Sequence, residues 1–118
     1  MPTGAGALDR RIQIQRATEA PDAAGQNILT FADWIPRSAN VKHLSGRELQ
    51  AAQQLVADVD TRFILRYDSE TATITADETF RIVYGARVYD VKHSQEDTDQ
   101  GRRRYWKILA RGRAEVAA

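Results

Sequence analysis

His43 and His93 are the side chains best suited to acid–base or metal chemistry, because imidazole titrates near neutral pH and binds transition metals. The two histidines lie far apart in the chain, and no pattern of carboxylates around them forms a metal triad. Ser45 lies two residues from His43, but the sequence around it lacks the strained elbow that marks a nucleophilic serine. We therefore expect no catalytic residue and no metal site here.

Aspartates and glycines offer no better site. Four aspartates could hold a hard cation only if loops brought their oxygens together, and they lack EF-hand spacing: Asp58, Asp60, Asp97 and Asp99. No glycine opens a helix in a phosphate-binding pattern. The chain has no cysteine, which excludes disulfides, thiolate nucleophiles and cysteine-based metal sites. We predict no cofactor and no enzymatic activity.

One cluster of cations, Arg102, Arg103 and Arg104, is a candidate contact site. It could bind phosphates or the carboxylates of a neighbouring subunit, and it could equally be the solvated start of a strand. Tyr105 and Trp106 follow it and could stack on bases, but aromatic residues at strand spacing more often belong to a core.

Length and composition indicate one compact domain. The chain has 118 residues, with 42% hydrophobic and 28% charged residues, close to globular averages. The net charge of +1 gives weak overall attraction to nucleic acid. Acidic residues gather in segments 68–78 and 96–99, and the C-terminal region is basic. No apolar run approaches the roughly 20 residues of a membrane-spanning helix, and no signal peptide is recognisable, so we expect synthesis in the cytoplasm.

The most informative segment is 41–67, which predicts a short helix followed directly by a strand. Ser45 and Glu48 have the spacing of a capping box, which predicts a helix start at Gly46. Leu49, Ala52 and Val56 then form a narrow apolar stripe. After residue 58 the period changes to two, as in a strand.

The rest of the chain is typical of β structure. Alternating or β-prone segments predict strands at 10–16, 28–40, 80–84, 87–93 and 103–111, with an edge position, a bulge or a bend near Pro36. Gly85-Ala86 predicts a type II′ hairpin. Segments 18–27, 70–78 and 94–101 are predicted loops, the second with one short strand at most. We expect a mainly β fold: a small antiparallel barrel or sandwich of about six strands, with the helix inserted between strands two and three.

These predictions divide the chain into three parts. They are a flexible arm at 1–7, a single β domain at 8–113 and a tail at 114–118.

In the order of its segments the chain resembles the head closure, or head–tail adaptor, proteins of tailed phages and phage-derived particles. The resemblance covers nearly all of residues 8–112 and rests on segments 8–16, 22–25, 31–34, 44–48, 62–67, 81–91 and 102–104. The sequences LSGRE at 44–48 and RIVYGARVYDV at 81–91, in this order and spacing, are its most specific parts.

The resemblance implies a structural virion protein made in the bacterial cytoplasm. Six or twelve copies would form a ring at the head–tail interface, between the portal or adaptor ring and the tail terminator or tail. The ring would extend or close the channel through which double-stranded DNA passes without sequence specificity. Relatives of this kind are often monomers in isolation, and some carry a stopper segment that blocks the channel. No membrane and no cofactor are implied.

Two sets of residues are our candidates for these contacts. Interface or channel residues are Arg102, Arg103, Arg104, Glu96, Asp97 and Asp99, with the acids of one copy facing the arginines of the next. Docking or stopper residues are His43, Leu44, Ser45, Gly46, Arg47 and Glu48, within the insertion 41–60.

Two other functions stay open at this point. One is a tail terminator or tail completion protein, since these also form rings of small β domains. The other is a nucleic-acid-binding β-barrel outside any virion, for which affinity would fall steeply with salt.

Overall fold

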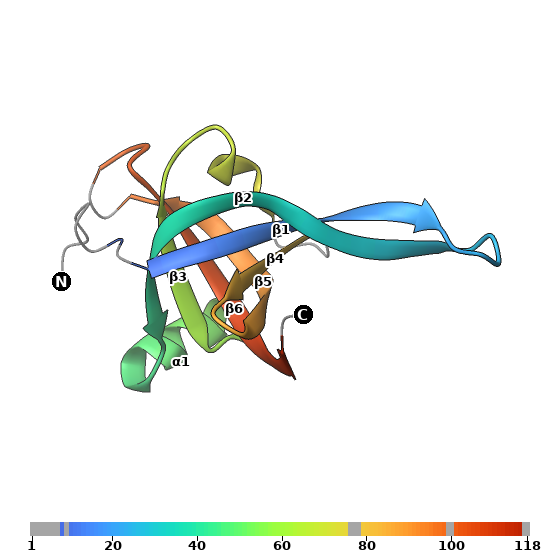
Figure 1. The fold of residues 1–118 in the computed structure, drawn as a ribbon. Coiled ribbons are helices and arrows are strands. Elements are labelled where there is room, and N and C mark those ends of the chain that lie inside the picture. Colours follow the sequence, from blue (N-terminus) through green and yellow to red (C-terminus); the bar gives the residue numbers. More distant parts are fainter. Residues whose placement is uncertain (1–7, 9, 76–78, 99–100, 117–118) are drawn as a thin grey trace.

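A computed structural model describes residues 8, 10–75, 79–98 and 101–116, with side chains as far as residue 113. The described residues form six strands and one α-helix, in the order β1 (Arg10–Pro21), β2 (Asn27–His43), α1 (Gly46–Leu55), β3 (Thr61–Arg66), β4 (Phe80–Tyr84), β5 (Arg87–Asp97) and β6 (Tyr105–Val116). A short 3-10 turn, η2 (Thr71–Thr73), lies between β3 and β4. The predicted class, strand number and helix position are confirmed (Figure 1).

The strands close into a barrel in the order β1-β2-β3-β6-β5-β4, with every neighbouring pair antiparallel. β1 closes the ring by pairing with β4 from Gln13↔Val83 to Arg16↔Phe80. Alternating apolar residues point inward because successive strand side chains face opposite sides of the sheet. The interior side chains include Ile12, Ile14, Phe63, Leu65, Ile82, Tyr89, Val91 and Ile108.

The predicted local irregularities occur where expected. The β1–β2 register shifts so that Ile14 faces Ile35 and Gln15 faces Asp33, which leaves a bulge close to Pro36. The β4–β5 hairpin turns at Gly85, whose φ is +61°, while Ala86 keeps a negative φ. A positive φ at the first central position alone is the type II′ pattern, so this hairpin is confirmed.

The predicted loop at 18–27 is much shorter than expected. β1 and β2 stay paired as far as Pro21↔Asn27, so only residues 22–26 form the turn. Asp22 organises that turn, because its carboxylate accepts hydrogen bonds from the amides of Ala24 and Gln26. We call residues 18–30 the arm. It projects well beyond the barrel, to the right in Figure 1.

Helix α1 starts at the predicted residue but without the predicted capping box. Ser45 is the N-cap and has an extended backbone, yet its side chain makes no capping hydrogen bond. Glu48 instead contacts cations of the neighbouring strands, as described below. The helix is held by a second small core of Leu44, Ala52, Val59 and Leu109, with Leu49 and Val56 beside it.

The predicted loop at 70–78 is a loop in its described part, where it contains the turn η2 and the fully buried Ile74. Two other segments differ from expectation. β5 continues through Asp97 because it pairs with β6 as far as Tyr105. β6 continues to Val116, which pairs with Arg87, into the predicted tail. The predicted arm at 1–7 lies outside the described residues.

Candidate interaction surfaces

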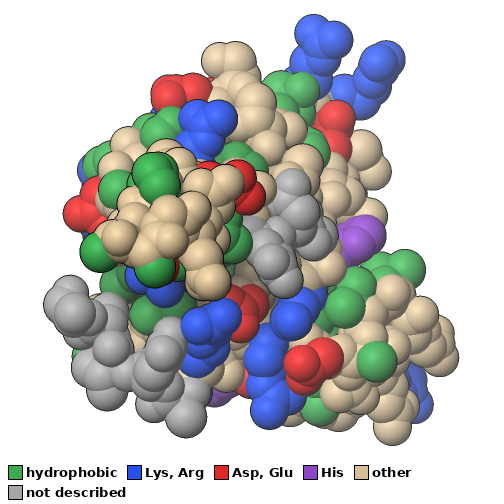
Figure 2. All heavy atoms as spheres, turned by 90° about the vertical axis from the view of Figure 1, so that its right-hand side faces the viewer, with side chains coloured by type: hydrophobic (Ala, Val, Ile, Leu, Met, Phe, Trp, Pro, Cys, Tyr) green, Lys and Arg blue, Asp and Glu red, His purple; other side chains and the backbone are tan. Residues whose placement is uncertain are grey.

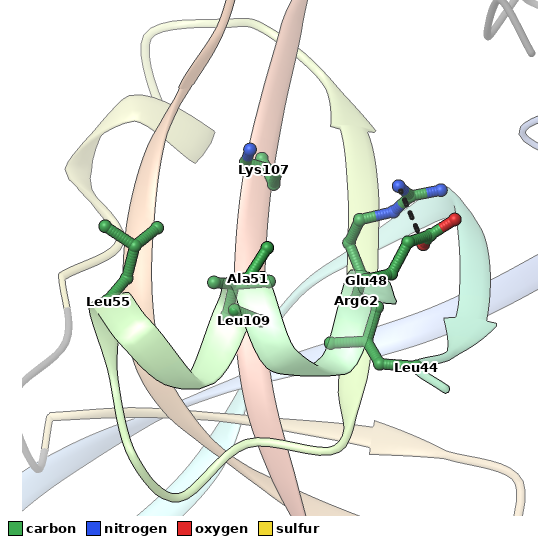
Figure 3. A pocket seen from close by; sticks show the side chains of 8 residues that line it. Leu44, Glu48, Ala51, Leu55, Arg62, Lys107 and Leu109 are labelled. Atoms are coloured by element: carbon green, nitrogen blue, oxygen red, sulfur yellow. Dashed lines mark ion pairs between the residues drawn. The ribbon is translucent and has the colours of Figure 1, made fainter. Parts of the chain in front are cut away.

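A groove lies between α1 and strands β3 and β6 (Figure 3). Its volume is about 180 Å³. The groove is lined by apolar side chains and three charges: Leu44, Glu48, Ala51, Ala52, Leu55, Arg62, Lys107 and Leu109. Helix α1 supplies one wall, because its narrow apolar stripe turns Ala52 toward the barrel and leaves Ala51 and Leu55 at the rim.

The charges in the groove are unequally paired. Glu48 accepts a 2.6 Å hydrogen bond from Lys42 and lies 3.7 Å from Arg62. The hydrogen bond from Lys42, helped by the positive charges of Lys42 and Arg62, lowers the pKa of Glu48. The Nε atom of Arg62 is buried and has no partner among the described residues. Lys107 makes no ion pair with a described residue, so its charge is available to a ligand.

The predicted docking segment splits into a buried anchor and an exposed surface. Leu44 is only 8% exposed and packs beneath α1. His43 is exposed, and its Nδ1 atom lies 3.3 Å from both the Asp60 carbonyl oxygen and the Thr61 hydroxyl. Ser45, Gly46, Arg47 and Glu48 are exposed at the start of the helix. Leu44 therefore holds the segment on the barrel, while the other five residues remain accessible.

The predicted arginine cluster forms the turn between β5 and β6. Arg102, Arg103 and Arg104 are all exposed. The Arg103 amide donates a 2.7 Å hydrogen bond to the Glu96 carboxylate, so these two candidates meet within one chain. Arg103 has a φ of +57°, in the left-handed region.

The remaining candidates around this turn have separate environments. Asp97 is buried, at 8% exposure. Asp99 lies outside the described residues. Tyr105 is buried, and Trp106 packs partly against the core, 6.0 Å from Tyr67 between ring centroids. Both aromatic residues thus stabilise the fold, as strand spacing suggested.

Aspartates near the far end of β6 are used in ion pairs. Arg111 lies 2.8 Å from Asp58 and 3.6 Å from Asp60. The second Asp60 oxygen accepts hydrogen bonds from the Thr61 hydroxyl and the Gly112 amide.

In the described part of the chain no three His, Cys, Asp or Glu residues are grouped so as to hold a metal ion. None of the helices in that same part is long and apolar enough to cross a membrane.

Sequence reasoning missed two surfaces. The first is the arm, where Ile28 and Leu29 are 48% and 45% exposed. The second is the rim of the groove, where Leu55 is 61% exposed near Lys107. The adjacent apolar pair Ile28-Leu29 could have signalled the first surface, because a strand with one face in solvent normally alternates apolar and polar residues.

Comparison with solved structures places this fold among known ones. The chain is similar to protein SF1141 from Shigella flexneri 2a, a solution structure, with 27% identity, a TM-score of 0.73 and coverage of 96% of this chain and 99% of that one. It is also similar to a chain in the virion of a native gene transfer agent particle, with 20% identity, a TM-score of 0.55 and coverage of 92% and 94%. The second likeness concerns the fold alone.

Comparison at the sequence level gives the family. No curated protein sequence matches this chain. The family model of the phage head completion protein matches residues 4–113, a span that includes most of the chain and all the surfaces described above. The chain therefore belongs to the phage head completion protein family, a family of structural phage proteins.

Proposed function

We propose that this protein forms a ring at the head–tail interface of a tailed phage or phage-like particle, where it extends or closes the portal channel and docks the tail. The observation that carries this proposal is the family match over residues 4–113. The shared fold with a chain of a gene transfer agent virion agrees with it. The proposed partners are further copies of the chain, six or twelve in a ring, with the portal or adaptor ring on one side and the tail on the other.

The distribution of charge supports contacts between copies. Arg102, Arg103 and Arg104 project from a turn at one end of the barrel, and their guanidinium groups are well placed to meet carboxylates of a neighbour. We assign the acidic segment 96–99 of the next copy as one partner, without Asp97, which is buried. Within one chain the Glu96 carboxylate already holds the Arg103 amide, which fixes the turn that presents these arginines.

The exposed part of segment 43–48 is our candidate for docking on an adjoining ring or for a stopper. Leu44 fixes this segment and helix α1 to the barrel, so a load on the segment is passed to the barrel. The proposed channel passes double-stranded DNA without reading its sequence. The net charge of +1 suits that role, because a strongly basic wall would retain DNA.

The test is deletion of the gene in the producing cell, followed by negative-stain electron microscopy of the particles. We expect two separate products to accumulate. One is tailless heads that are filled with DNA or leak it, and the other is complete free tails. Heads that carry tails of uncontrolled length would instead favour a tail terminator. Normal joined particles would refute the proposal, and salt-sensitive DNA binding by the purified protein would then favour a nucleic-acid-binding barrel.

Complementation of the deletion tests the charged contact. We expect Arg103→Glu with Arg104→Glu to reduce the yield of joined particles, because like charges would then face each other between copies. Arg11→Glu with Arg87→Glu, two exposed arginines outside this turn, the docking segment and residues 18–30, is the matched control. Equal yields from both variants would remove the arginine turn from the interface.

A further inference from the structure

The arm lacks the contacts that stabilise the rest of the sheet. β4 pairs with β1 only as far as Arg16, and β3 pairs with β2 only from Ala39 onward. Among the described residues, neither edge of the arm therefore has a further strand partner, and twelve of its thirteen residues are exposed. A two-stranded hairpin with no covered face is marginally stable in water. The exposed Ile28 and Leu29 side chains add an unfavourable apolar surface. These features are typical of a segment that is covered in an assembly.

The two faces of the arm differ in chemistry. Residues directly opposite each other in an antiparallel pair share a face. Leu29 lies opposite Glu19, and Ile28 lies opposite Ala20. One face thus combines Leu29 with a carboxylate, while the other is uncharged and carries Ile28, Ala20, Thr18 and Thr30. Glu19 makes no hydrogen bond or ion pair with any described residue, whereas the Asp22 carboxylate is used in the turn.

The groove beside α1 has the complementary chemistry. Leu55 and Ala51 stand at its rim, and Lys107 lies on β6 across from them (Figure 3). The Lys107 ammonium has no carboxylate partner among the described residues, since Glu48 is already paired with Lys42 and Arg62. An apolar side chain flanked by a carboxylate would therefore fill the groove and form an ion pair with the Lys107 ammonium. The arm carries no basic residue between positions 18 and 30 that would be repelled there.

Arm and groove lie at opposite ends of the molecule. In Figure 1 the arm projects to the right, while α1 lies at the lower left, so a chain cannot fill its own groove. Figure 2, viewed from the side of the arm, shows hydrophobic side chains at the surface among charged ones. The molecule measures 51 × 29 × 23 Å along its principal axes, an elongation that suits a reach to a neighbour.

We infer that the arm of one copy lies in the α1 groove of the next copy, with Leu29 against Ala51 and Leu55 and with Glu19 beside Lys107. This inference rests on the proposed ring. The contact joins two different surfaces, and such a heterologous interface closes into a ring when the rotation between copies allows it. The contact also gives the arm the cover that its own chain does not supply.

Engineered cysteines test the contact directly, because the natural chain has none. A chain carrying Leu29→Cys with Leu55→Cys, and a second carrying Leu29→Cys with Ala51→Cys, would replace the wild type in the producing cell. Purified particles would be oxidised and run on a non-reducing gel. We expect a ladder of covalent multimers from at least one pair, because a disulfide forms only where the two residues approach closely. Ile28→Cys with Leu55→Cys is the matched control, similar in exposure but on the opposite face of the arm.

The outcomes separate this inference from the proposed function. A ladder that depends on Leu29→Cys and is lost with Ile28→Cys supports the contact. Particles that contain the chain but give no ladder, or an equal one from the control, overturn the contact and leave the ring in place. Joined particles from the wild-type gene that lack the chain overturn both proposals.

A charge exchange gives a second readout. Glu19→Lys and Lys107→Glu alone should each lower the yield of joined particles, and the two together should restore it, because the double variant re-forms the ion pair between copies. Failure of the double variant to exceed the single variants would overturn the assigned pairing of these two residues.

Discussion

The attachment of α1 to the barrel predicts a large difference between two leucines near the same helix. Leu44 is 8% exposed in the small core beneath α1, and Leu55 is 61% exposed at its end. Changing either leucine to alanine removes the same three carbon atoms. Any difference in the free energy of unfolding therefore reports the burial of each site.

The magnitude follows from burial. Removal of three buried carbons costs about 2.4 kcal/mol, at about 0.8 kcal/mol for each buried CH₂ group. A residual cavity adds to this, and measured Leu→Ala changes in cores span roughly 2–5 kcal/mol. Because the groove lets neighbouring atoms relax around Leu44, we expect the lower part of that range, about 2–3 kcal/mol, for Leu44→Ala. For Leu55→Ala we expect less than about 1 kcal/mol, since most of the side chain is already in water.

The assay is equilibrium unfolding in urea of the isolated protein, followed by far-UV circular dichroism and by the fluorescence of Trp34 and Trp106. Leu44→Ala should lower the midpoint by more than about 1 M urea, with an unchanged slope, and Leu55→Ala should lower it far less. Equal shifts for the two variants would refute the reasoning, because they would mean that Leu44 is not held in a core beneath α1.

Three further predictions concern backbone and charge. Gly112→Ala should destabilise the protein by about 1–3 kcal/mol, because the added Cβ would lie 3.1 Å from the buried Tyr89 ring, and thermal unfolding would measure the loss. Gly85→Ala meets no atom within 4 Å but forces alanine to a φ of +61°, so it should cost about 1 kcal/mol in the same assay. For Asp68, burial acts to raise the pKa, but hydrogen bonds from the amides of Thr71 and Glu70, together with the charge and hydrogen bond of Arg37, outweigh it and lower the pKa. The ionised Asp68 carboxylate therefore contributes its full stabilisation above the pKa of the unfolded chain, and this stabilisation is lost as the pH falls through the lower pKa of the folded state. Between pH 5 and pH 2, the urea midpoint should fall less steeply for Asp68→Asn than for the wild type.

The elements that sequence reasoning located well are those specified by neighbouring residues. The β4–β5 hairpin depends on alternation from Phe80 onward and on a glycine at the first turn position, and both act within a few residues. The helix start at Gly46 and the bulge near Pro36 are local in the same way. Such signals need no knowledge of the partner strand.

The arm was missed because it lacks the burial that creates a period of two. Turn-forming residues between Pro21 and Asn27 indicate a loop, and they do form one, but only at residues 22–26. The flanking residues pair with one another without a core beneath them. Hydrophobic alternation therefore carries no information about where the strands end.

The capping box was wrong for a tertiary reason. Its residues have the correct spacing, but β2 and β3 bring Lys42 and Arg62 to Glu48. The Glu48 carboxylate accepts its hydrogen bond from Lys42, so it does not reach back to the helix start. The groove was beyond prediction for the same reason, since its lining comes from the helix and from two strands that the sequence does not place beside each other.

The position of β6 in the ring has a consequence for folding kinetics. β6 is the last of the six strands in sequence, yet it lies between β3 and β5. The opposite seam joins β1 to β4 across a wide sequence separation, 66 residues between Gln15 and Arg81. Neither the β3–β6 pairing nor the β1–β4 pairing can form from segments that are adjacent in sequence. The chain therefore loses a large loop-closure entropy before burial of the core compensates for it. We expect a single cooperative folding step on a timescale of about milliseconds to seconds, and removal of β6 should leave the other strands without a stable sheet.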